Sequence, residues 1–444
     1  WAEDKSPEIK PSDIIVYEMH HRDFSIDALS GILNKGKFIA MSEEGTQSAE
    51  GEKTGLDHLK ELGINHVHIL PSYDYASVDE SRLNEPQYNW GYDPVNYNVP
   101  DGSYSTDPYN PSVRIKEFKQ MVQAYHDANI EIVMDVVYNH TFDIENNCFQ
   151  KCVPDYYYRK TDHGYSDASA CGNEVASEKP MVSKYIVDSL KYWVEEYHID
   201  GFRFDLASIL GRNKDGSPMD NPPLLESLAN DAILSNVKLI AEAWDAGGLY
   251  QVGSFPASKR WAEWNGRYRD TMRGYLKGEN WEAGNAAWCI CGSGDIYGGA
   301  FSEDTGNYAG YNSCVNFLTC HDGFTLYDLY SYNVKHNEAN GWNNTDGADD
   351  NRSWNCGVEG ETDDSEVLAL RHRMQRNACA VLMCSRGTPM FLAGDEFGNT
   401  KFGNNNSYCQ DNEISWVDWS LFEKNQDLFE FFKFMIEYRK KHPI

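Results

Sequence analysis

The chain has 444 residues, of which 41% are hydrophobic and 13% aromatic, so it can bury a large core. Its 39 basic and 69 acidic side chains give a net charge of −30, which disfavours nucleic acid and anionic membranes as partners. No uncharged apolar run reaches the roughly 18 residues that a membrane helix requires. We therefore expect a globular protein with a neutral or cationic substrate, and the 12 Trp and 28 Tyr residues offer flat faces suited to sugar rings.

Predicted strands and helices alternate along the chain. Apolar runs and period-two alternation predict eight strands, at residues 13–19, 65–71, 131–137, 201–208, 238–242, 261–264, 313–319 and 388–393. Apolar residues at steps of three or four predict helices at residues 55–62, 112–129, 179–198, 365–384 and 427–441. This alternation predicts one α/β domain over residues 1–444, a (β/α)8 TIM barrel with long βα loops.

Three segments depart from the alternation. Residues 72–111 are rich in Tyr, Asn, Pro and Gly and have too little apolar periodicity for a regular element, so we predict a long functional loop there. Residues 141–178 are predicted to form an irregular excursion after the third strand. Residues 343–350 (NNTDGADD) resemble a calcium-binding loop, but Trp342 and Ser353 would occupy its first and last ligand positions, which favours an Asx-rich turn.

The cysteines indicate reduced thiols. There are 11 of them, an odd number without a zinc-ribbon spacing, in a chain too large to depend on a disulfide framework. The close pairs Cys148 with Cys152 and Cys289 with Cys291 leave a disulfide or a metal site as the alternative at those positions.

The sequence also favours a cytoplasmic location. No apolar leader precedes Pro11, although a mature secreted chain would look the same. The tripeptide Asn139-His140-Thr141 is a glycosylation sequon at a predicted strand end. Since a glycan there would obstruct a site at that end, we expect that the chain does not pass through a glycosylating compartment.

The fourth predicted strand, with the sequence GFRFDLAS, carries charged groups on one face. Its alternation places Phe202, Phe204 and Leu206 on one side and Arg203 and Asp205 on the other. Catalytic groups of parallel barrels lie at the carboxyl ends of strands, so Asp205 is the first candidate for chemistry. The alternative is a buried Arg-Asp ion pair that only closes the strand.

Three acids, Asp205, Glu242 and Asp322, end three separate predicted strands. Only a closed barrel brings such positions together, and His140 and His321 also lie at strand ends. Cleavage of a glycosidic bond requires one carboxylate at the anomeric carbon and one protonated acid at the leaving oxygen. A metal site built from the same histidines and carboxylates is the competing interpretation, but the typical HExxH spacing is absent.

These motifs resemble, in order, the four signature regions of the α-amylase superfamily, glycoside hydrolase family 13. The motifs are DVVYNH, GFRFDLAS, LIAEAWD and FLTCHD, at residues 135–140, 201–208, 239–245 and 317–322. The resemblance implies that Asp205 is the nucleophile and Glu242 the general acid and base. It implies that Asp322 distorts the sugar and stabilises the transition state.

The same resemblance assigns the groups that hold the reacting glucose. His140, Arg203 and His321 would bind it, and Tyr92 in the WGYDP segment would stack on it. The chemistry requires no metal or cofactor. The superfamily resemblance allows a structural calcium near the loops after the third strand, where Asn139, Asp143 and Glu145 cannot by themselves define a site.

Within the superfamily, the two halves of the chain are similar to different debranching groups. Residues 13–200 resemble type I pullulanases, for example in YNWGYDPVNYNVPDGSYSTDP and CGNEVASEKPMV. From residue 205 onward the chain resembles isoamylases and glycogen debranching enzymes, for example in EAWDAGGLYQVGSFP and SYNVKHNEANG. Members of both groups usually carry a β-sandwich before the barrel, and we expect such accessory domains to be absent here.

The resemblance implies a retaining hydrolase of α-1,6 branch linkages in glycogen, amylopectin or limit dextrins, with an isoamylase-type preference. A pullulanase-type α-1,6 hydrolase is one alternative. A noncatalytic glucan-binding subunit, of the kind found among isoamylase-like chains, is another, but such chains typically lose catalytic acids. All three acids are present in this sequence, so we expect an enzyme whose partner is a branched α-glucan.

Overall fold

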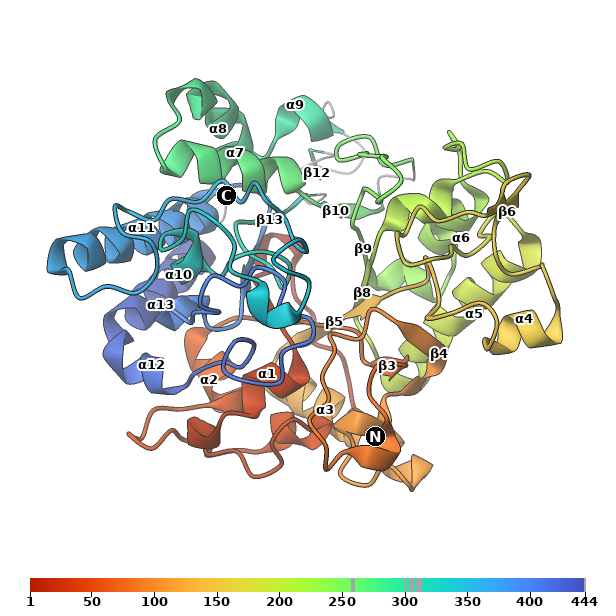
Figure 1. Cartoon of the computed structure of the whole chain (residues 1–444), viewed down its shortest axis with the longest axis horizontal. Coiled ribbons are helices and arrows are strands. Elements are labelled where there is room, and N and C mark those ends of the chain that lie inside the picture. Colours follow the sequence, from red (N-terminus) through yellow and green to blue (C-terminus); the bar gives the residue numbers. More distant parts are fainter. Residues whose placement is uncertain (257–259, 299–300, 303–306, 309–313, 443–444) are drawn as a thin grey trace.

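Eight parallel strands close into a barrel, as the alternation predicts (Figure 1). The structure is a computed structural model that describes residues 1–256, 260–298, 301–302, 307–308 and 314–442. The barrel order is β1-β14-β13-β10-β9-β8-β5-β2. Its strands are β1 (Val16–Met19), β2 (His66–Ile69), β5 (Glu131–Val136), β8 (Gly201–Phe204), β9 (Lys238–Ala241), β10 (Ala262–Trp264), β13 (Cys314–Phe317) and β14 (Thr388–Leu392). Each corresponds to a predicted strand, and Ser313, the predicted start of the seventh, lies outside the described residues.

Helices surround the barrel (Figure 1). The five predicted helices are confirmed to within two residues as α2 (Gly55–Leu62), α3 (Pro111–Asp127), α5 (Pro180–Tyr197), α11 (Ser365–Cys384) and α13 (Gln426–Lys441). The others are α1 (His21–Ser25), α4 (Cys148–Cys152), α6 (Pro223–Asn230), α7 (Gly266–Leu276), α8 (Ala283–Ile290), α9 (Gly294–Tyr297), α10 (Leu326–Leu329) and α12 (Ser420–Lys424). Apolar spacing does not mark α7, whose start is set by the Asn265 side chain accepting a hydrogen bond from Tyr268 N.

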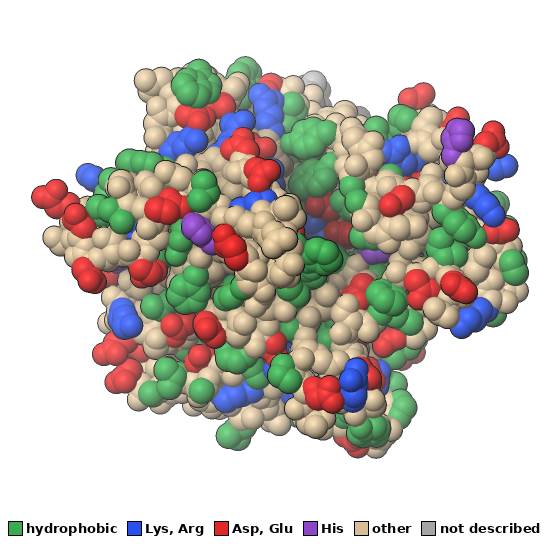
Figure 2. All heavy atoms as spheres, in the orientation of Figure 1, with side chains coloured by type: hydrophobic (Ala, Val, Ile, Leu, Met, Phe, Trp, Pro, Cys, Tyr) green, Lys and Arg blue, Asp and Glu red, His purple; other side chains and the backbone are tan. Residues whose placement is uncertain are grey.

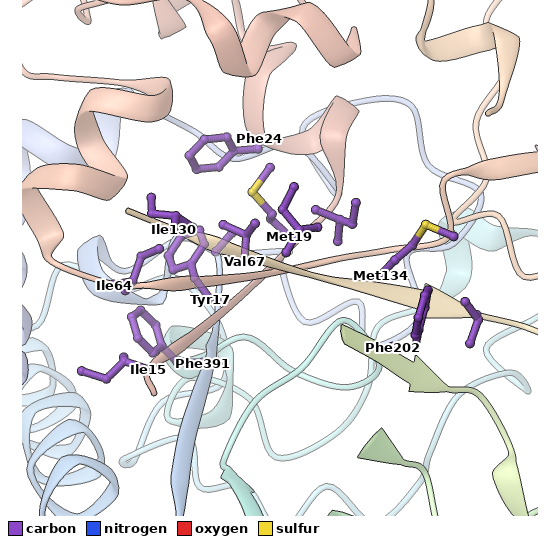
Figure 3. Close-up of a cluster of buried hydrophobic side chains, with 14 of the residues drawn as sticks. Ile15, Tyr17, Met19, Phe24, Ile64, Val67, Ile130, Met134, Phe202 and Phe391 are labelled. Atoms are coloured by element: carbon purple, nitrogen blue, oxygen red, sulfur yellow. The ribbon is translucent and has the colours of Figure 1, made fainter. Parts of the chain in front are cut away.

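The barrel strands have two different faces. Their outward side chains, among them Tyr17, Val67, Phe202 and Phe391, join the large core between the barrel and its helices (Figure 3). Inward side chains such as Val16 form a smaller apolar cluster inside the barrel. Nearer the carboxyl ends, the inward positions become polar and charged while remaining buried: Glu18, His68, Asp135 and Arg203.

The fourth predicted strand ends earlier than expected. Pairing stops at Phe204, so Asp205 and Leu206 follow the strand and do not continue its alternation. Leu206 adopts a left-handed conformation with φ of 42°, which is costly for a leucine and turns the chain sharply at the end of the strand.

Both long segments contain regular structure that the sequence analysis did not predict. Within 72–111, β3 (Tyr73–Tyr75) pairs with β4 (Pro94–Pro100) in an antiparallel sheet, so the prediction of no regular element was wrong. Within 141–178 the irregular excursion includes α4 and a hairpin of two-residue strands, β6 (Lys160–Thr161) and β7 (Gly164–Tyr165). A further small sheet pairs β11 (Phe301–Ser302) with β12 (Asn307–Tyr308).

The described part of the chain contains no disulfide bond, so neither Cys148 with Cys152 nor Cys289 with Cys291 is joined. Within the same ranges, no helix has the length and apolar character needed to cross a membrane.

The N-terminal segment is attached to the amino-terminal end of the barrel through buried charges. His126, at the end of α3, lies 3.0 Å from Asp4 through Nδ1 and 3.0 Å from Asp200 through Nε2. Asp4 also contacts His198 Nδ1 at 2.6 Å. Burial alone lowers the pKa of His126, but the two carboxylates outweigh it and hold the pKa above its ordinary value.

This arrangement predicts a pH-dependent contribution to stability. Because the pKa of His126 is raised on folding, its stabilising effect is fully present below the unfolded pKa of about 6.5 and is lost as the pH rises through the folded pKa. The melting temperature of His126→Gln should therefore lie below that of the wild type at pH 6, and the difference should shrink towards pH 9. A difference that is constant or that widens with pH would contradict this account.

Candidate active site

The buried guanidinium of Arg203 joins the charged groups at the carboxyl ends of β5, β8 and β9. Its Nη1 lies 3.0 Å from Asp135 Oδ1 and 3.2 Å from Asp205 Oδ1, and its Nη2 lies 3.1 Å from Glu242 Oε2. The indole of Trp264 covers one face, with the ring centroid 4.1 Å from the guanidinium carbon. Asp205 and Glu242 are thereby held beside adjacent nitrogens of one guanidinium group.

Asp205 is also fixed by an amide that the sequence analysis did not assign to the site. Asn139 Nδ2 donates to Asp205 Oδ2 at 2.7 Å and to the Asp205 carbonyl at 2.9 Å. Its Oδ1 is left to accept from His140 Nδ1 at 2.6 Å. His140 is therefore oriented through Asn139 beside Asp205, and burial lowers its pKa and favours a neutral ring.

Glu242 follows the last residue of β9 and is almost completely buried. The Leu206 backbone N–H donates to Glu242 Oε2 at 2.6 Å, so the left-handed turn after β8 supplies a fixed donor. Burial raises the pKa of Glu242, the charge of Asp205 raises it further, and Arg203 only partly opposes both effects. A carboxyl group with a raised pKa stays protonated at a pH where an ordinary carboxyl group is ionised, so it is suited to act as a general acid.

Tyr92 and His321 form a stacked pair, with ring centroids 5.1 Å apart and an angle of 21° between the rings. The Tyr92 hydroxyl donates to Asp135 Oδ2 at 2.8 Å. Burial alone raises the pKa of Asp135, but the charge of Arg203, together with the hydrogen bond and charge of His68, outweighs burial and holds this pKa below its ordinary value. Tyr92 is therefore tied through Asp135 to the guanidinium that holds the two acids.

His321 is held by Glu18, a residue of β1 that sequence reasoning missed. Both Glu18 oxygens are used: Oε2 accepts from the His321 backbone N–H at 2.6 Å, and Oε1 lies 2.8 Å from His321 Nδ1. Burial alone lowers the pKa of His321, but the Glu18 carboxylate outweighs it and raises this pKa above its ordinary value. Because Nδ1 faces Glu18, Nε2 is the nitrogen left for a ligand.

The structure thus brings Asp205, Glu242, Arg203, His140, Tyr92 and His321 together, directly or through one intervening side chain. Asp322 differs from the other two acids because its side chain is exposed to solvent. Figure 2 shows a hollow near the centre of the displayed face, with acidic and histidine side chains on its floor and hydrophobic side chains at its rim.

The superfamily resemblance allows a structural calcium near the loops after the third strand. Within the described ranges, two groups of side chains have ligand atoms close enough to share one ion: Glu18 with Cys320 and His321, and Asp74 with Glu80 and Asp101. In the first group both Glu18 oxygens are bonded to His321. In the second, the Arg114 guanidinium already contacts Glu80 at 2.6 Å and supplies the positive charge. Neither group includes Asp143 or Glu145.

A model of the α-amylase catalytic domain matches residues 37–170 and 172–427. The chain belongs to the α-amylase family. This assignment agrees with the barrel and with the acids at its strand ends, and it confirms the resemblance that the four sequence motifs indicate.

Two relatives match this chain over its whole length. The chain is 44% identical over 460 residues to isoamylase 3, chloroplastic, of Oryza sativa subsp. japonica, covering 100% of this chain and 56% of that protein. It is 44% identical over 457 residues to a glycogen operon protein GlgX homolog of Mycobacterium bovis, covering 100% of this chain and 60% of that protein. The chain therefore spans little more than half the length of these relatives.

A similar solved structure is the apo pullulanase from Paenibacillus barengoltzii, with a TM-score of 0.82 and 37% identity. The match covers 100% of this chain and 64% of that one. The same pullulanase in complex with maltohexaose and α-cyclodextrin gives a TM-score of 0.81.

The charge coupling between the two acids predicts a measurable shift. Since the charge of Asp205 raises the pKa of Glu242, Asp205→Asn should lower that pKa towards the ordinary carboxyl value. A pH titration followed by NMR of protein labelled with ¹³C at glutamate carboxyls would detect it, with Glu242→Gln to assign the signal. An unchanged or higher pKa in Asp205→Asn would contradict the coupling.

Proposed function

We propose that this chain is the catalytic barrel of a retaining glycoside hydrolase that cleaves α-1,6 branch linkages in glycogen, amylopectin or limit dextrins. The observation that carries the proposal is the pair Asp205 and Glu242 on the two terminal nitrogens of Arg203, with the pKa of Glu242 raised. A retaining mechanism needs one carboxylate ionised and a neighbouring carboxyl protonated, and burial together with the charge of Asp205 favours the protonated form of Glu242.

In the proposed reaction, Glu242 protonates the glycosidic oxygen while Asp205 Oδ attacks the anomeric carbon, so that the bond to the leaving chain breaks as the bond to Asp205 forms. A water molecule, deprotonated by Glu242, then releases the sugar from Asp205. His140, Arg203 and His321 bind the reacting glucose and Tyr92 stacks on it. Asp322, which is exposed, becomes covered by the sugar and stabilises its developing positive charge.

Three further features belong to the proposal. The carboxyl groups suffice for the chemistry, so dialysis against EDTA should leave activity intact. The preferred substrate is a branched glucan, because relatives named isoamylase and GlgX match over the whole chain.

The proposed location is the cytoplasm, because the buried Asn139 is bonded to Asp205 and cannot carry a glycan without breaking the site.

Replacement of the nucleophile tests the chemistry. Asp205→Asn should retain the fold and lose about four orders of magnitude in kcat, because a neutral amide cannot form the glycosyl intermediate. A mechanism-based fluorinated glucosyl inhibitor should label Asp205 in the wild type, as read by peptide mass spectrometry. Labelling of another carboxylate, or substantial activity in Asp205→Asn, would defeat the assignment.

Substrate comparison tests the preference. We expect faster release of reducing ends from amylopectin and glycogen than of maltotriose from pullulan, at equal substrate mass and with amylose as the unbranched control. The pullulanase-type alternative has support from the similar solved structures. Faster turnover of pullulan would select that alternative, and release of short linear fragments from amylose would exclude α-1,6 specificity altogether.

A further inference from the structure

A continuous series of aromatic rings runs from the candidate active site to the protein surface. Trp90 lies edge-on to His321, with centroids 5.0 Å apart, and its ring is 6.4 Å from that of Tyr408. The hydroxyl of Tyr408 accepts a hydrogen bond from Trp342 Nε1 at 2.9 Å. Since Tyr92 stacks on the other side of this series, against His321, the rings connect the proposed glucose position with Trp342.

Exposure rises along the series. Trp90 is 5% exposed and belongs to a small apolar cluster against which Tyr92 and Tyr408 pack, whereas Trp342 is 58% exposed. Exposing most of an indole to water gains nothing for folding. The hydrogen bond from Trp342 Nε1 to the Tyr408 hydroxyl nevertheless limits rotation of the Trp342 indole.

The segment that carries Trp342 is fixed by buried amides. Asn337 Nδ2 donates to Asn405 Oδ1 at 2.8 Å, and the Asn405 backbone N–H donates to Asn337 Oδ1 at 2.9 Å. Both asparagines are fully buried. Gly347 has φ of 74°, and a Cβ there would lie 2.3 Å from Asn405 Oδ1, so the segment passes too close for any other residue.

These contacts also explain the NNTDGADD segment. Asn344 Oδ1 accepts from the Asn337 backbone N–H at 2.8 Å, and Asp346 Oδ2 accepts from Asn340 and Asn406 amides at 2.8 and 2.9 Å. Asn344 Oδ1 and Asp346 Oδ2 are therefore engaged in hydrogen bonds that hold the segment. The Asx-rich turn is therefore the better description, and its effect is to present Trp342.

We propose that Trp342 and Tyr408 form a binding platform for a linear α-1,4-linked segment of the glucan whose reacting glucose lies at Tyr92. The inference rests on the proposed function. A glucose ring has an apolar face and a polar edge, which matches an exposed indole whose position is fixed. Because the platform is already ordered before binding, little conformational entropy is lost when the glucan binds, and long chains gain more affinity than short ones.

The test is binding of maltohexaose to proteins that also carry Asp205→Asn, so that no turnover is needed. Trp342→Ala should raise the Kd for maltohexaose about three- to tenfold, as expected for the loss of one stacking surface. In the active background, the same change should raise KM for amylopectin by a similar factor and leave kcat nearly unchanged. Trp281→Ala is the matched control, because Trp281 is also exposed (75%) and takes no part in the aromatic series.

Two milder variants keep the test decisive if Trp342→Ala disturbs the segment. Trp342→Phe retains a ring and should lose less affinity than Trp342→Ala, and Tyr408→Phe removes only the hydrogen bond and should lose affinity without lowering the melting temperature. Unchanged Kd and KM in these Trp342 and Tyr408 variants, or equal losses in Trp281→Ala, would overturn the platform. Absence of α-1,6 hydrolysis by the wild type would instead overturn the proposed function, while the binding measurement would still report on Trp342.

Discussion

The buried charge of Arg203 is the constraint on which the rest of the site depends. Its side chain is 1% exposed, so without partners its desolvation would cost several kcal/mol. Asp135 is its buried counter-ion at Nη1, and Asp205 and Glu242 lie beside Nη1 and Nη2. The same contacts that make a guanidinium tolerable inside the barrel fix the two carboxylates relative to each other.

The barrel permits this arrangement because its strands face two environments. Outward side chains supply the apolar core against the helices (Figure 3). The inward faces are therefore free to carry polar groups near their carboxyl ends, where Glu18 orients His321 and Asp135 orients Tyr92. Tyr92, His140, Arg203 and His321 thus each have a buried partner that limits rotation of the side chain, whereas the Asp322 side chain is exposed.

Sequence patterns predicted where the barrel strands end better than they predicted which side chains meet at those ends. The sequence selects Asp205 and Glu242 as candidates because each lies towards the end of a predicted apolar strand. Glu18 was missed because it lies inside β1. A single polar residue among apolar ones does not indicate that its carboxylate binds His321, in the loop after β13. The sheet of β3 and β4 was missed because β4 is bounded by Pro94 and Pro100, and its pairing with a distant segment is not local information.

The configuration of the first product tests the central claim most directly, because a covalent intermediate leads to retention: the nucleophile attacks the face opposite the leaving chain, and water then attacks the face that the leaving chain has vacated. In ¹H NMR of amylopectin digestion at early times, before mutarotation, the account predicts that the newly formed reducing ends appear as the α-anomer. Initial appearance of the β-anomer would show a single displacement by water, and would contradict a nucleophilic Asp205 held beside Glu242 by Arg203.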